Sequence, residues 1–203
     1  MRVSRLLGVA LAIGLVGAAS AARAGDLLQP KTIVISAENL TELNVISVSN
    51  GGNGGTFFAL FGNPTSNLSP YEIPRLAVDG FITDKITVGG ALIFARLSPD
   101  RGGDETIFTI SPRVGFMLPL SANIGLWPRG GFTYYNDDQA GVTVSGFALD
   151  LEGMFVFKLI DRFAIVAGPV IDIGLTGSVS AAGNSADERI SNFGIRAGVL
   201  SWF

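Results

Sequence analysis

The chain has 203 residues, neither cysteine nor histidine, and a formal net charge of −3 at pH 7. These absences exclude disulfide bonds, metal sites built on thiolate or imidazole, and catalysis by a Ser-His-Asp triad. Only 15% of the residues are charged and the mean hydropathy is +0.45, whereas a soluble β-protein normally carries more surface charge.

The first 24 residues have the pattern of a secretory signal peptide. Arg2 and Arg5 precede an apolar run, and Ala22-Arg23-Ala24 resembles an A-x-A cleavage site. We predict cleavage after Ala24 and one domain over residues 25–203. The alternative is a retained anchor helix, for which this Gly- and Ala-rich stretch is marginal in length.

Cleavage would leave 11 basic residues against 17 acidic ones, a net charge of −6. An acidic chain without a basic stripe is not expected to bind nucleic acid. After residue 24, no run approaches the roughly 18 apolar residues of a membrane helix. The high hydropathy therefore needs another explanation.

That explanation comes from strand-like runs whose connections alternate between short and long. Short turns are expected at 83–85, 119–121 and 160–162, and longer loops at 98–104, 136–141 and 177–189. Outer-membrane barrels have short periplasmic turns and longer outer loops. The alternation predicts an all-β fold, a transmembrane antiparallel up-and-down β-barrel of eight strands. The expected strands are 31–48, 73–82, 85–97, 105–118, 122–135, 142–158, 163–176 and 190–203.

Two features leave alternatives open. The segment 56–61 lies in the expected first outer loop, 49–70, but is itself strand-like, so that it extends the wall, forms a small hairpin or plugs the mouth. Pro112, Pro128 and Pro169 fall inside strands, where each removes a ladder donor, and we expect bulges or local breaks there.

Taken in period two, the strands have apolar rows on one side and charges on the other. Charges in mid-membrane strands are costly on the lipid side, so we expect them to point inward. We predict an ion-paired network that fills the lumen, the alternative being side chains that solvate a water-filled tube. The members are Arg75, Asp79, Arg113, Arg129, Asp150, Glu152, Asp172 and Arg196.

Aromatic residues are expected to mark the two membrane interfaces, with Tyr134 and Tyr135 at the outer one. Trp202, Phe203, Phe157 and Phe163 would mark the periplasmic one. Six inward glycines could leave gaps between charged layers: Gly89, Gly125, Gly168, Gly174, Gly194 and Gly198.

The final strand presents Phe193, Ile195, Ala197, Val199 and Phe203 on one side. The ending with Val199, Trp202 and Phe203 resembles the closing strand of bacterial outer-membrane barrels, in which a final Phe is part of an assembly signal.

From about residue 31 onward, the chain resembles the OmpA-like and OmpX-like small outer-membrane barrels. Segments at 74–76, 127–131 and 201–203 also resemble uncharacterised outer-membrane barrels of myxobacteria. The resemblance implies the bacterial outer membrane, a lipid environment and the barrel assembly machinery as a partner during biogenesis.

Three functions stay open for such a fold. The first is a structural or surface-interaction barrel whose outer loops meet a partner, and the second is a narrow pore or small-ligand conduit. The third, an enzyme, is disfavoured because related catalytic barrels rely on histidine. A soluble periplasmic ligand-binding barrel is the rival fold, but it would have an apolar lumen and a polar exterior.

No cofactor and no metal is expected. Asp150 and Glu152 lie two apart on one strand face, where ion pairing to arginine is favoured over acid-base chemistry. The acids Asp100, Asp104, Asp137 and Asp138 are interpreted as solvated loop residues in preference to an oxygen-ligand metal site.

Overall fold

The computed structural model describes residues 31–49, 55–60, 71, 73–97 and 104–203. The predicted signal peptide and Asp100 lie outside these residues, so neither expectation is tested. In the described part of the chain, no helix has the length and apolar character needed to cross a membrane.

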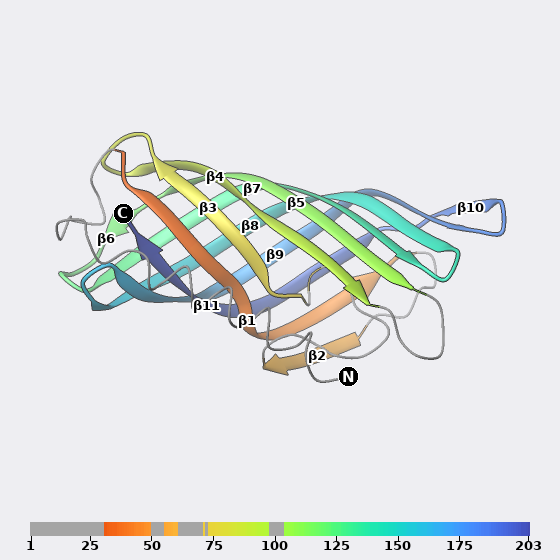
Figure 1. The fold of residues 1–203 in the computed structure, drawn as a ribbon, viewed down its shortest axis with the longest axis horizontal. Helices are drawn as coiled ribbons and strands as arrows, with labels where there is room; N and C mark the ends of the chain where they lie inside the picture. The colour runs from red at the N-terminus through yellow and green to blue at the C-terminus, as the bar shows by residue number, and fades with distance from the viewer. Residues whose placement is uncertain (1–30, 50–54, 61–70, 72, 98–103) are drawn as a thin grey trace.

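Eight strands form a closed antiparallel barrel, which confirms the predicted fold class (Figure 1). Each wall strand pairs with the next, and the last pairs with the first. They are β1 (Ile33–Val48), β3 (Arg75–Phe81), β4 (Ile86–Leu97), β5 (Glu105–Phe116), β7 (Ile124–Gln139), β8 (Val142–Ile160), β9 (Phe163–Ala181) and β11 (Ile190–Trp202).

Three short strands are added to this wall: β2 (Gly55–Leu60), β6 (Leu118–Pro119) and β10 (Asn184–Asp187). β2 pairs with residues 41–46 of β1. Residues 33–38 of β1 pair with β3. Of the three possibilities for this segment, the structure therefore shows the extended wall. β6 pairs with β7, and β10 pairs with the end of β9.

Two of the predicted outer loops are wrong, because the chain stays in strands there. Residues 136–139 still pair with β8, and the β7–β8 connection is only Ala140 and Gly141. In the same way, β9 runs to Ala181 and turns through Ala182 and Gly183. Both turns have positive φ at two successive residues, the geometry of a tight hairpin. These extensions were not predicted, because they carry polar side chains on both faces and therefore lack the apolar row that marks a lipid-facing strand.

The prolines do not produce the expected bulges. Register shifts occur instead at 37–41 in β1, at 147–148, and at 158–160. Beside Pro112 and Pro169 the ladder has local gaps without a change of register, so only the expected breaks are seen. At the β1 shift, Asn39 has a φ of 58° and its side-chain amide donates to the Ile73 carbonyl at 3.2 Å.

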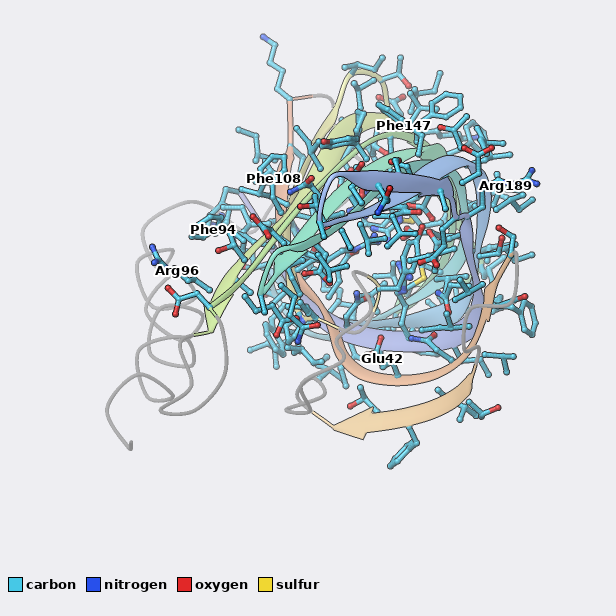
Figure 2. All side chains as sticks on the ribbon, turned by 90° about the vertical axis from the view of Figure 1, so that its right-hand side faces the viewer. Glu42, Phe94, Arg96, Phe108, Phe147 and Arg189 are labelled. Atoms are coloured by element: carbon cyan, nitrogen blue, oxygen red, sulfur yellow. The ribbon has the colours of Figure 1, made fainter. Side chains whose placement is uncertain are left out.

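Apolar side chains cover the outside of the barrel. The outward rows contain residues from every wall strand, and Phe94, Phe108 and Phe147 project from the outer surface in Figure 2. This is opposite to the exterior of a soluble barrel, so the rival fold is wrong. The most exposed members include Val45, Val78, Phe94, Val114, Phe132, Phe147, Phe193 and Ile195.

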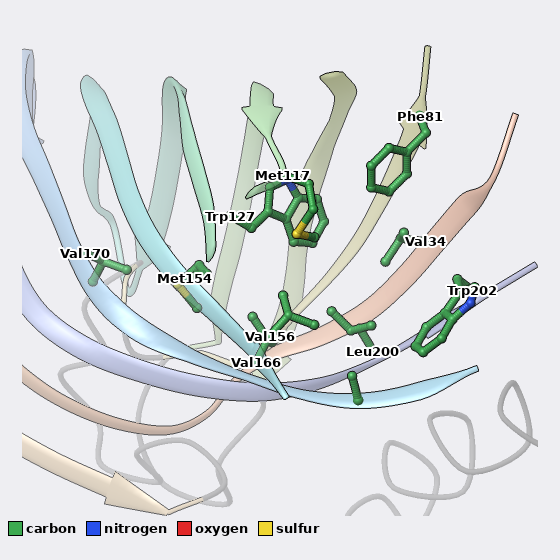
Figure 3. Packing of buried hydrophobic residues seen from close by; sticks show 11 residues of the cluster. Val34, Phe81, Met117, Trp127, Met154, Val156, Val166, Val170, Leu200 and Trp202 are labelled. Atoms are coloured by element: carbon green, nitrogen blue, oxygen red, sulfur yellow. The ribbon is translucent and has the colours of Figure 1, made fainter. Parts of the chain in front are cut away.

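The interior is layered, which differs from the uniformly polar lumen that we expected. A large apolar cluster lies toward the short turns and includes Phe81, Met117, Trp127 and Trp202 (Figure 3). Two smaller apolar clusters lie toward the long connections, around Ile46, Tyr71 and Tyr135 and around Ile93 and Ile107. Charged side chains occupy the level between them.

Trp202 and Tyr135 belong to these interior clusters, so their assignment to the membrane interfaces is wrong. Tyr135 follows the outward Tyr134 and must face inward by strand alternation. At the chain end the alternation fails, because Leu200, Ser201 and Trp202 are all buried.

The lipid-facing band can be tested by charge substitution. We expect Val114→Arg, at mid-strand on the outer face, to lower the free energy of unfolding by about 2–4 kcal/mol, since Arg is costly near the bilayer midplane. Urea unfolding in lipid vesicles measures this. The control Ile86→Arg lies on the same outer face but beside the β3–β4 turn, so it should change this free energy by only about 0–1 kcal/mol. Equal effects of the two substitutions would contradict the expected position of Val114 near the bilayer midplane.

Candidate functional site: a buried charge layer

Three arginines lie between two glutamates at the centre of the lumen. Arg75, Arg113 and Arg129 approach Glu38 at 2.7, 2.9 and 2.7 Å. The same guanidinium groups also form ion pairs with Glu152, at 2.5 Å from Arg129 and 3.6 Å from Arg113. Each arginine therefore has at least two anionic partners, which come from different strands.

Further ion pairs surround this centre. Asp79 accepts two hydrogen bonds from Arg113, at 3.0 and 2.6 Å. Arg196 on β11 bridges Glu152 and Asp172, each at 3.2 Å. All the members of this charge layer are at most 5% exposed. Buried charges are tolerated only when they are paired and hydrogen-bonded, which this geometry largely provides.

Small residues make room for the long side chains. A methyl group on Gly131 would lie 2.9 Å from Cβ of Arg113, and one on Gly89 would lie 2.6 Å from a carboxylate oxygen of Asp79. Arg129 also lies over the Trp127 ring, 4.6 Å from its centroid, which joins the charge layer to the large apolar cluster.

The structure brings all eight predicted residues into this one layer. The sequence reasoning missed two more inward carboxylates, Glu38 and Glu42 on β1, and Glu38 contacts three arginines. The sequence did contain the pattern that indicates them. Ile33, Leu43 and Val45 occupy odd-numbered positions and face outward, so side chains at even-numbered positions of the same strand face inward. On the described strands, the inward set therefore contains six carboxylates, two more than the predicted residues include.

The acids near the outer rim have a different environment. Asp137 lies beyond the lipid-facing Tyr134 and Phe147 on the β7–β8 hairpin, and burial together with the Glu105 and Asp138 carboxylates raises its pKa to about 7. Within the described residues, no three Asp, Glu, His or Cys side chains are grouped to hold a metal ion.

The predicted assembly residues lie at the barrel seam. The main chain of Phe203 exchanges two hydrogen bonds with Ile33, at 3.1 and 3.0 Å, and its side chain is exposed. Val199 is half-buried in the β9–β11–β1 ladder. Trp202 faces inward, with Lys158 Nζ 6.0 Å from its ring centroid. A role in assembly stays a prediction.

Comparison with known proteins supports the architecture. Neisserial surface protein A has a TM-score of 0.51 at 12% identity, over 84% of this chain and 97% of that one. OprG from Pseudomonas aeruginosa gives 0.51 and 12%, over 88% and 99%, and AlkL gives 0.55 and 11%, over 90% and 94%. No family model and no curated protein matches the chain.

The chain has the fold of the small bacterial outer-membrane β-barrels. Its apolar exterior requires a lipid environment, and barrels of this fold lie in the bacterial outer membrane. The barrel carries its charges inside and its apolar rows outside, as a membrane-spanning wall requires.

The charge layer can be tested by a double-mutant cycle. Arg129→Ala leaves Glu38 and Glu152 less compensated and should lower the free energy of unfolding by about 3–5 kcal/mol. Adding Glu152→Ala should cost less than the sum of the single changes, with a coupling of about 0.5–3 kcal/mol. Urea unfolding in vesicles measures each variant.

The exposed pair Lys158 and Asp161 provides the matched control for this cycle. Because water screens it, we expect a coupling below about 1 kcal/mol. Coupling at Arg129 and Glu152 no larger than that would contradict a specific ion-paired layer.

Proposed function

We propose that this outer-membrane barrel is closed to ions and solutes and has a structural or surface-interaction role. The observation that carries the proposal is the charge layer, to which seven of the eight wall strands contribute, all except β4. An eight-stranded barrel has an interior just wide enough to be filled by side chains, and ion-paired arginines fill it well.

The apolar clusters on both sides of the layer favour the same conclusion. An ion that passed the charged level would still meet Trp127, Met117 and Trp202 near the short turns. Desolvated passage through a packed apolar cluster is unfavourable. Closure therefore rests on two barriers of different chemistry.

The narrow-pore alternative relied on gaps above inward glycines. A methyl group on Gly89, Gly168, Gly174, Gly194 or Gly198 would overlap neighbouring atoms, and on Gly125 it would lie 3.0 Å from the Met117 sulfur. At Gly168, Gly174 and Gly198 these atoms belong to the main chain of the neighbouring strand, so the glycines serve the close approach of the wall strands and are no evidence for a conduit.

The outer end offers the surface for a partner. The β7–β8 and β9–β10 hairpins extend beyond the lipid-facing rows and carry polar, exposed residues at their tips. We further propose that the assembly machinery reads the closing strand and that the protein is not an enzyme, since histidine-dependent catalysis has no residue to use.

Planar-bilayer recording tests closure. We expect no steady unitary conductance from the wild-type barrel. A porin added afterwards is the positive control for channel insertion into the same membrane, and circular dichroism verifies that the barrel is folded. A steady wild-type conductance that changes in Asp172→Asn or Arg196→Gln would contradict closure and favour the narrow pore.

Cysteine labelling tests which end faces outward, and the chain has no native cysteine to interfere. In intact cells, a membrane-impermeant maleimide should label Ser185→Cys at the β9–β10 tip. The matched variant Asp84→Cys, in a short turn, should react only after the outer membrane is permeabilised. The reverse pattern would contradict short turns at the periplasmic end.

A further inference from the structure

The buried charge layer has an excess of negative charge. Besides Glu42, which accepts a hydrogen bond from Asn44, its four arginines face five carboxylates on the described strands: Glu38, Asp79, Asp150, Glu152 and Asp172. Because a buried, uncompensated charge is strongly unfavourable, the extra negative charge needs a counter-charge.

The excess is concentrated at Asp150 and Asp172. These residues are directly opposite one another on β8 and β9, and both are 1% exposed. Neither carboxylate oxygen of Asp150 has a hydrogen-bond partner, and its ion pair with Arg75 is 3.7 Å long, beyond hydrogen-bond reach. In Asp172, Oδ2 accepts from Asn192 and Arg196, whereas Oδ1 has no hydrogen-bond partner.

Two buried amides add carbonyl oxygens to this group. Asn192, opposite Asp172 on β11, uses its Nδ2 as a donor to Asp172 at 2.9 Å, which leaves its Oδ1 without a hydrogen-bond partner. Asn44 on β1 donates to Glu42 at 2.8 Å and also has an unpartnered Oδ1. That oxygen occupies the space above Gly194, the next inward residue after Asn192.

Five oxygen atoms on four consecutive wall strands therefore lack donors in the protein interior: both of Asp150 and one each from Asp172, Asn192 and Asn44. The hydrogen bonds of the nearby guanidinium groups go to other carboxylate oxygens, and Arg196 Nε makes none. Arg75 donates to Glu38 and Glu152, and Arg196 to Glu152 and Asp172.

We propose that these oxygens bind one divalent cation of the calcium type. Carboxylate and amide oxygens are the ligands that calcium prefers, and its flexible coordination by six to eight oxygens suits donors spread over several strands. Magnesium, which demands near-ideal octahedral geometry, should bind more weakly. The site goes beyond the proposed closure, since calcium binding and conductance are measured separately.

The experiment uses the full folded barrel in phosphatidylcholine vesicles, stripped with EDTA. Calcium chloride is then titrated calorimetrically, and the urea midpoint is measured with and without calcium. We expect one calcium per barrel and a higher urea midpoint that EDTA reverses. Asp150→Asn and Asn192→Ala should each weaken calcium binding by roughly tenfold or more, because even the loss of a residue that only supports a metal ligand typically costs about 10–100-fold in affinity.

Asp79→Asn is the matched control, because it makes the same chemical change in an equally buried carboxylate whose oxygens are both bonded to Arg113. It should lower the urea midpoint yet keep the calcium response. A wild-type barrel that binds no calcium, an Asp150→Asn variant that retains the full response, or equal losses in Asp79→Asn would overturn the proposal. Protonation of the two aspartates would then account for the charge.

Discussion

Arg75, Arg113 and Arg129 each form ion pairs with both Glu38 and Glu152, and these five residues come from five wall strands. A slip of one residue in any of these strands would turn its charge toward lipid and its apolar row toward the lumen. The charge layer and the lipid-facing rows consequently fix the same register from opposite sides of the wall.

Lipid imposes the second condition, because it offers no hydrogen-bond partner to an exposed strand edge. Pairing of β1 with β11 closes the wall, and the main-chain bonds between Ile33 and Phe203 complete that seam. The narrow lumen that results has to be packed by side chains. Apolar clusters pack its two ends, so the arginines are needed only at the middle level.

Sequence periodicity was sufficient for the wall strands and for eight inward charges, because lipid on one side makes period-two rows unambiguous. It failed where that contrast disappears. Residues 136–139 have polar side chains on both faces, and the last three residues before Phe203 are all buried. Glu38 could have been predicted to face inward from the alternation of the first strand. Its arginine partners, up to 91 residues away in the sequence, could be identified only from the three-dimensional structure.

The position of Arg196 on the final wall strand has a consequence for how the barrel forms. Until β11 docks, Asp172 lacks its closest cation, and Glu152 lacks one of its four. Closure of the wall and completion of the charge layer are thus one event, in which β11 supplies the missing cation. Because β1 and β11 are far apart in the sequence, their pairing is intrinsically slow, and we expect this step to limit the rate of folding.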